Sequence, residues 1–139
     1  METAFLSLAR LFADMTNIKN EVFFRDSMWD WTPFNKCFRY GIRISDIDGV
    51  VERNGKCLYI ETKSPGTPIP IGQQKLHQQW LRKGDTVLIV WGQPNSPESA
   101  LLMHSDKWKK RYDNCDNELL ERIVKEWFEY ADKRIKDDE

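Results

Sequence analysis

Two acidic residues and a lysine are spaced in this sequence as the ligands of a divalent cation and a helper cation would be. Asp48 is followed after twelve residues by Glu61, and Lys63 lies two positions further on. Carboxylate oxygens are the ligands that hard cations such as Mg²⁺ prefer, and substrate phosphate often completes the shell. A bound cation would stabilise charge on phosphoryl oxygens and generate a nucleophilic water, and an ammonium group would add electrostatic stabilisation. These three residues are therefore the candidate catalytic group, with Asp48 and Glu61 as metal ligands.

A predicted β-hairpin brings the two carboxylates together. The segment 47–62 consists of two β-branched and apolar runs on either side of an Asn-Gly pair, which is typical of a two-residue type I′ turn. Counted outward from that turn, Asp48 faces Glu61 and Asp46 faces Lys63, and all four side chains project from one face. Like charges opposite each other destabilise a sheet, so a bound cation is expected to offset their repulsion.

The same segment leaves a second interpretation open. Asp46 and Lys63 would form a cross-strand ion pair while Asp48 and Glu61 are simply exposed at a sheet end, and a β-bulge would destroy the register. Asp46 has three possible roles: an extra metal ligand, a group that orients Lys63, or an exposed strand residue. We favour the role of orienting Lys63. The opposite face is predicted to be core, and it carries Ile47, Val51, Leu58 and Ile60.

A strand-helix-strand unit follows the hairpin. After a loop rich in proline at 64–72, a helix is predicted over 73–83 and is stopped by Gly84. The continuous apolar run 86–91 is typical of a parallel strand that is covered on both faces. Because strand, helix and strand in this order form a right-handed crossover, we expect an α/β fold with a mixed central β-sheet flanked by helices.

The remaining elements are expected near the two ends of the chain. Apolar residues recur at helical intervals over 2–24, and a strand-like run at 42–44 precedes the hairpin. A loop at 92–99 is expected to lead to a short strand at 101–104, and the last helix is predicted over 117–135. Its apolar stripe is expected to be core and consists of Leu119, Leu120, Ile123, Val124, Trp127, Phe128 and Ala131.

Length and composition favour one intracellular domain. With 139 residues, 40% of them hydrophobic, one core over 1–136 is expected, with a solvated tail at 137–139. No apolar run approaches membrane-spanning length and the start lacks the basic region of a secretory signal, so a cytoplasmic protein without membrane contact is expected. The three cysteines are far apart and indicate neither a disulfide framework nor a zinc knuckle. A net charge of -1 argues mildly against nonspecific coating of nucleic acid.

The stretch SDIDGVVERNGKCLYIETK resembles the core motif of the PD-(D/E)XK nuclease superfamily, an acidic residue on one strand followed by Glu-x-Lys on the next. Its spacing is similar to that of archaeal Holliday junction resolvases, and IGQQKLHQQWLRKGDTVLIVWG is similar to a segment of phage-type and VRR-Nuc members. The resemblance covers residues 17–92, and Ile47 stands where the named motif has proline. It implies a restriction-endonuclease-like core, dependence on Mg²⁺ or Mn²⁺, and hydrolysis of DNA phosphodiester bonds inside a cell, including a phage-infected host.

The resemblance also adds supporting residues to the candidate site. Glu21 is similar to a glutamate that many relatives add to the metal site from the first helix, the alternative being an ordinary surface residue. Gln73 stands where similar nucleases place a glutamine near the metal, and a surface position at the start of a helix is equally open. Lys75 and His77 are candidates for facing the substrate, although a lone histidine on a helix is more often a surface or half-core residue.

The run 106–112 interleaves cations with two aromatic residues, a composition suited to phosphate contact and base stacking or to a plain solvated loop. The nucleic-acid-binding candidates are Lys75, Lys107, Lys109, Lys110 and Arg111.

The expected function is that of a Mg²⁺-dependent deoxyribonuclease, an endonuclease acting on branched, nicked or single-stranded DNA. The alternatives are a catalytically inactive nucleic-acid-binding module of the same fold and an interaction subunit that uses the last helix. The sequence leaves three questions open: whether the substrate is DNA or RNA, whether cleavage is internal or from an end, and whether the protein is a monomer or a homodimer.

Overall fold

The computed structural model describes residues 28–105 and 107–133, and the chain divides at Ile47 and Asp48 into two units that are described separately. In the first unit, a short 3-10 helix η1 (Thr32–Cys37) is the described regular element. The strand expected around Ile42 and Ile44 is wrong, because residues 42–47 have no regular structure and both isoleucines are exposed. The segment 2–24, predicted as one helix or as two helices broken near Thr16 and Asn17, lies outside the described residues.

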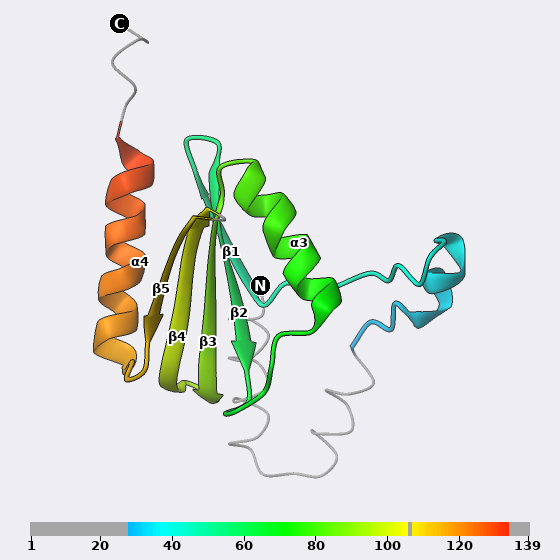
Figure 1. The fold of residues 1–139 in the computed structure, drawn as a ribbon, viewed down its shortest axis with the longest axis horizontal. Coiled ribbons are helices and arrows are strands. Elements are labelled where there is room, and N and C mark those ends of the chain that lie inside the picture. The colour runs from blue at the N-terminus through cyan, green and yellow to red at the C-terminus, as the bar shows by residue number, and fades with distance from the viewer. Residues whose placement is uncertain (1–27, 106, 134–139) are drawn as a thin grey trace, which may run out of the picture. The chain divides into compact units, whose positions relative to one another are not determined.

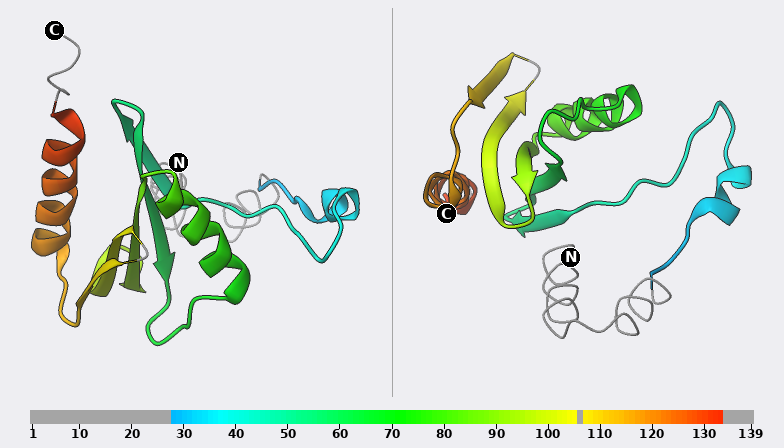
Figure 2. Two further views of the ribbon diagram at one scale, coloured as in Figure 1. Left: turned by 45° about the horizontal axis from the view of Figure 1, so that its top comes forward. Right: turned by 90° about the horizontal axis from the view of Figure 1, so that it is seen from below.

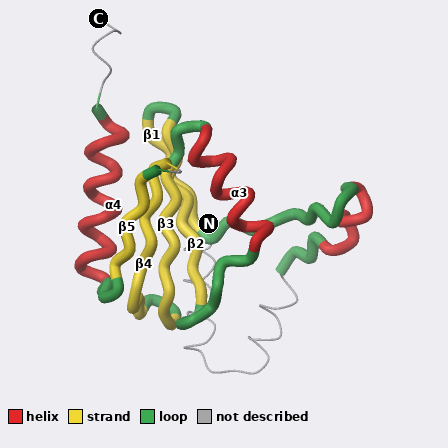
Figure 3. The backbone as a smooth tube through the Cα atoms, viewed as in Figure 1, coloured by secondary structure: helices red, strands yellow, loops and turns green. Residues whose placement is uncertain are grey.

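A five-stranded mixed sheet forms the second unit (Figure 1, Figure 3). In spatial order its strands are β1 (Gly49–Arg53), β2 (Lys56–Lys63), β3 (Thr86–Gln93), β4 (Ser96–Ser105) and β5 (Trp108–Tyr112). Strands β2 and β3 are parallel, and the other neighbours are antiparallel. The expectation of an α/β fold with a mixed sheet flanked by helices is therefore confirmed.

The hairpin of β1 and β2 has the predicted turn and register. Asn54 and Gly55 have φ angles of 53° and 78°, the positive pair that a type I′ turn requires. The pairs run from Arg53 opposite Lys56 to Gly49 opposite Ile60, with no bulge. The turn chemistry alone therefore fixed which residues of the two strands face each other.

Helix α3 (Ile71–Arg82) connects β2 to the parallel strand β3. Its end is a Schellman motif in which Gly84 N–H donates to Leu81 O and Asp85 N–H donates to Trp80 O, both at 3.1 Å. Gly84 has a φ of 89°, which explains why glycine stands there. The predicted helix stop is confirmed, and the helix starts two residues earlier than expected, after Pro70.

The sheet is covered on both faces, by α3 on one and by α4 (Asn117–Asp132) on the other (Figure 2). Asp116 is the N-cap of α4, and its carboxylate accepts a hydrogen bond from Leu119 N–H at 2.9 Å. Ile123, Trp127 and Ala131 of α4 pack on Leu58 and its neighbours, whereas Phe128 is exposed, contrary to the expected stripe. None of the helices in the described ranges is long and apolar enough to span a membrane.

The opposite layer packs α3 against alternate residues of the same strands. Trp80 and Leu81 contact a cluster that includes Val87, Ile89 and Met103. Because side chains alternate along a strand, β2, β3 and β4 each contribute to both cores. This explains why the predicted buried strand reads as one continuous apolar run.

Two segments predicted as loops are strands. Most of 92–99 belongs to β3 and β4, which meet at a turn of Pro94 and Asn95, and β4 is longer than expected. The sequence reads as a loop there because glycine and proline are concentrated around the turn, but pairing with β3 decides the conformation. The run at 108–112 likewise becomes the edge strand β5.

We predict that Gly92→Ala destabilises the fold whereas Gly72→Ala does not. A Cβ at Gly92 would meet the backbone of the returning strand, the carbonyl oxygen of Ser96 and Cα of Pro97, the latter at 2.8 Å. Backbone cannot move aside as a flexible side chain can, so a loss of about 1–3 kcal/mol is expected. A Cβ at Gly72, in α3, meets nothing within 4 Å. Urea unfolding of both variants checks this, and equal stabilities would contradict it.

Candidate functional site

The site is built on the last residues of β2. Glu61 is buried, with 5% of its surface exposed, and Lys63 is half-buried. Both lie on the same face of β2 as Tyr59, because every second residue of a strand projects to the same side. The Tyr59 ring stacks on Trp80 of α3, with 3.8 Å between the ring centroids. Glu61 and Lys63 therefore project into the layer between the sheet and α3. This corrects the expectation that one face of the hairpin is core and the other only chemistry, because α3 packs on the chemical face as well.

Asp48 lies immediately before β1 and is held by the opposite strand. Its Oδ2 accepts hydrogen bonds from Thr62 N–H at 2.6 Å and from Thr62 Oγ1 at 2.9 Å. Pairing of the two strands stops at Gly49, so the Asp48 carboxylate takes the place of the next backbone acceptor for Thr62. The other oxygen, Oδ1, makes no hydrogen bond with any described residue. Asp48 is thus fixed at the end of the hairpin where Glu61 and Lys63 lie, although not as a ladder pair with Glu61.

Helix α3 runs back along β2 and presents polar groups to this end. Two residues of a strand cover about 6.6 Å along its axis, and one turn of a helix covers about 5.4 Å. Because these lengths are similar, each successive turn of α3 lies over the next residue on the facing side of β2. Trp80 lies against Tyr59, and the turns that carry His77 and then Gln73 continue toward Glu61 and Lys63. Among the described residues, buried Oε1 of Gln73 and both ring nitrogens of His77 have no hydrogen-bond partner. Unpartnered buried polar atoms are costly and commonly mark a functional site.

His77 reports on the electrostatics of the layer. Burial, with a smaller contribution from the ammonium of Lys63, lowers its pKa from 6.5 to about 4. The imidazole is only 3% exposed and lies at 5.5 Å from the Trp80 ring, centroid to centroid. At neutral pH it is therefore neutral, with one nitrogen as a donor and the other as an acceptor.

The other residues predicted to support the site are placed as follows. Glu21 lies outside the described residues, and its metal-binding role stays a prediction. Asp46 belongs to the first unit, where its carboxylate accepts a hydrogen bond from Trp31 Nε1 at 3.0 Å. Its pairing with Lys63 would join the two units and also stays a prediction. Lys75 is exposed on α3.

The basic run at the sheet edge is divided between two faces. Arg111 pairs with Leu101 and Lys109 with Met103, so both lie on the face that α3 covers. The Arg111 guanidinium stacks at 5.3 Å from the centre of the Trp91 ring.

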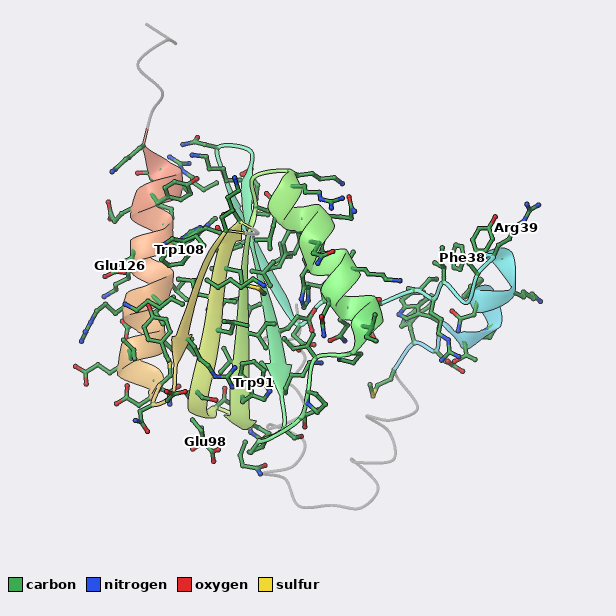
Figure 4. All side chains as sticks on the ribbon, in the orientation of Figure 1. Phe38, Arg39, Trp91, Glu98, Trp108 and Glu126 are labelled. Carbon is green, nitrogen blue, oxygen red and sulfur yellow. The ribbon has the colours of Figure 1, made fainter. Side chains whose placement is uncertain are left out.

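On the other face, Trp108 lies near α4, 5.0 Å from the His104 ring, and Lys110 lies over Tyr112 at 5.0 Å (Figure 4). Strand alternation thus separates Lys109 and Arg111 from Trp108, and the role of these residues in binding nucleic acid stays a prediction. Lys107 is exposed in the turn before β5.

The donor set fits a Mg²⁺-type cation. Mg²⁺ is usually held by one or two carboxylates and keeps several waters. Asp48 and Glu61 supply the two carboxylates at one end of the hairpin, and Gln73 adds a buried amide oxygen on the helix above it. Within 28–105 and 107–133, no three His, Cys, Asp or Glu side chains gather as a ligand group.

Thr62 is the residue of the candidate site that sequence reasoning missed. Alternation places its side chain on the face opposite to Glu61 and Lys63, so the strand pattern gave no reason to select it. Its role depends on where β1 ends, since its N–H then becomes available to the Asp48 carboxylate. Only the ladder of the folded hairpin contains that information.

Comparison with known proteins gives no relative. No family model, no curated protein and no solved structure matches the chain.

We predict that His77 makes the protein less stable in mild acid. Its pKa of about 4 in the folded state lies below the ordinary 6.5 of the unfolded chain, so the unfolded chain binds more protons between these values. Stability is thus complete above pH 6.5 and is lost as the pH falls toward 4, by at most about 3 kcal/mol.

Unfolding of native protein and His77→Phe at several pH values measures this contribution. The variant should lose less stability between pH 7 and pH 4. His104→Phe is the matched control, because the pKa of His104 is also lowered by burial and the His77 contribution remains in that variant. An unchanged pH slope in His77→Phe would count against the assignment.

Proposed function

We propose that this protein is a metal-dependent nuclease that hydrolyses DNA phosphodiester bonds, an endonuclease with a restriction-endonuclease-like core. In this proposal Asp48 and Glu61 hold Mg²⁺ or Mn²⁺, and Lys63 acts at the scissile phosphate. The supporting observation is that Asp48, fixed by Thr62, lies at the same end of the hairpin as buried Glu61 and half-buried Lys63. The resemblance to the PD-(D/E)XK motif supplies the reaction class.

Each group has a distinct part in the proposed reaction. Asp48 accepts two hydrogen bonds on one oxygen, which orients its carboxylate and leaves Oδ1 for the cation. Burial of Glu61 keeps its carboxylate in a low-dielectric layer, where attraction to a cation is stronger than in water. A bound divalent cation would polarise the phosphate and activate water.

Lys63 complements the carboxylates by binding a phosphate oxygen. Lys63 is half-buried and lies on the same face of β2 as Tyr59, so its side chain belongs to the layer under α3. Because His77 is neutral, it carries no positive charge that would attract the phosphate away from Lys63. The ammonium therefore stabilises the charge that develops on the phosphate during attack by water.

DNA as the substrate is supported by the charges on the same face. Lys109 and Arg111 of β5 project on the side of the sheet that carries Glu61 and Lys63. A local basic group can steer a phosphate backbone although the net charge of the chain is -1.

We predict that Asp48→Asn, Glu61→Gln and Lys63→Ala each lower the cleavage rate by about 10²–10³, since each removes one group that stabilises the transition state. Plasmid and labelled branched, nicked and single-stranded DNA are incubated with Mg²⁺, Mn²⁺ or chelator, and products are resolved on gels. Glu52→Gln is the matched control, because Glu52 is an exposed carboxylate of the same strand pair.

The outcome separates the enzyme from the alternative. Native protein that binds DNA without cutting it in either metal would support the inactive binding module. Folded variants that cut as fast as native protein would refute these catalytic assignments.

We also predict that Mg²⁺ or Mn²⁺ raises the melting temperature of native protein and of Glu52→Gln but not of Asp48→Asn. A ligand that binds only the folded state stabilises it by about 2.7 kcal/mol at a hundredfold excess over its Kd. Thermal unfolding with and without metal measures this independently of any activity. The same metal response in Asp48→Asn and native protein would exclude Asp48 as a ligand.

A further inference from the structure

A pocket of about 230 Å³ lies between α3 and the strands β4 and β5. Its apolar lining includes Leu81 of the helix and Leu101 and Met103 of β4. Its polar groups include His77 and Gln78 of α3 and Lys109 of β5. An apolar pocket with a few polar groups is the usual form of a small-molecule site. It is smaller than the roughly 300–1,000 Å³ of pockets for drug-sized ligands, so it suits a single ring system.

His77 is the group in this pocket that lacks a partner. It is 3% exposed, and neither ring nitrogen has a hydrogen-bond partner among the described residues. A neutral imidazole offers one donor and one acceptor. The two nitrogens point away from each other, so the edge of a polar ligand could hydrogen-bond one of them, whereas an apolar ligand could bond neither.

The charges around the pocket favour an anionic backbone next to that ligand. Lys109 lines the pocket, and Arg111 follows on the same face of β5. The lining contains no acidic residue. A ring attached to a phosphate therefore fits the pocket better than a free neutral ring.

The pocket adjoins the proposed catalytic end. His77 lines the pocket and lies one turn before Trp80, which stacks on Tyr59 of β2, the strand that ends with Glu61 and Lys63. A strand whose phosphate contacts Lys63 would thus bring a neighbouring nucleotide to the mouth of the pocket.

We propose that this pocket receives one unstacked nucleobase of the substrate strand, with His77 hydrogen-bonding the edge of the base and Lys109 contacting the adjoining phosphate. The inference rests on the proposed function for the identity of the strand. It implies a preference for unpaired or easily opened DNA over intact duplex, because a paired base must first leave the stack.

The test measures binding in chelator, where no metal-dependent cleavage occurs. The probes are a fluorescently labelled single-stranded DNA, the same strand with abasic sites, and its duplex. Gln78→Trp fills the pocket from an exposed helix position, and Gln79→Trp is its control at the next exposed position, which is not part of the lining. Lys109→Ala is compared with Lys125→Ala, an exposed lysine of α4, the helix on the opposite face of the sheet.

Native protein should bind the base-bearing single strand about tenfold more tightly than the abasic strand or the duplex. Gln78→Trp should lose that preference, and Lys109→Ala should weaken binding of both single strands, while both controls bind like native protein. Thermal unfolding verifies that the variants are folded.

The inference is overturned if native protein binds the abasic and base-bearing strands equally, or if each variant binds like its control. It also fails if the pocket variants change the rate of cleavage but leave the preference for base-bearing over abasic DNA unchanged. Base-dependent binding that persists in a protein unable to cut DNA would refute the proposed function and keep the pocket assignment.

Discussion

The register of the β1–β2 hairpin is the constraint on which the rest of the site depends. The Asn-Gly turn selects one pairing of the two strands, and side chains alternate between the faces of a sheet. A slip of one residue would move Glu61 and Lys63 to the layer under α4 and bring Leu58 and Ile60 under α3. The same residues that form one core would then lose their packing, so packing and turn chemistry specify the same register.

The α3 layer combines packing with poorly satisfied polar groups. Trp80 and Leu81 anchor the helix on the sheet, and one or two turns earlier the same helix buries His77 and the amide oxygen of Gln73 without partners among the described residues. Buried polar atoms in this state reduce stability. A core selected only for stability would replace them with apolar groups, so their presence is consistent with a site kept for ligand binding.

The two faces of the sheet have different roles. The α4 side contains a closed apolar core around Leu58, Trp127 and Ala131, and Arg53 of the hairpin is tied to Asp132 at the end of α4. The α3 side carries Glu61, Lys63 and the pocket with Lys109, next to a second core around Trp80 and Ile89. Glu61 and Lys63 therefore lie outside the core under α4.

The sequence by itself determined the local structure and the candidate site. The Asn54–Gly55 turn, the stop at Gly84, the amphipathic pattern of α4 and the apolar run of β3 are local signals, and each element they predicted is present. The hypothesis that Asp48, Glu61 and Lys63 form one site came from counting along one hairpin, although the strand pairing ends at Gly49 and Ile60, one pair before Asp48 and Glu61.

The tertiary structure decided which faces are covered and where strands end. Residues 92–99 and 108–112 carry turn residues and charges, and only pairing with a neighbouring strand makes them β-structure. The burial of Glu61 and His77 under α3, the bond from Thr62 to Asp48, and the separation of Lys109 from Trp108 depend on partners far away in the chain. Propensity and periodicity describe a segment's own preferences, whereas burial and pairing are properties of two segments that meet.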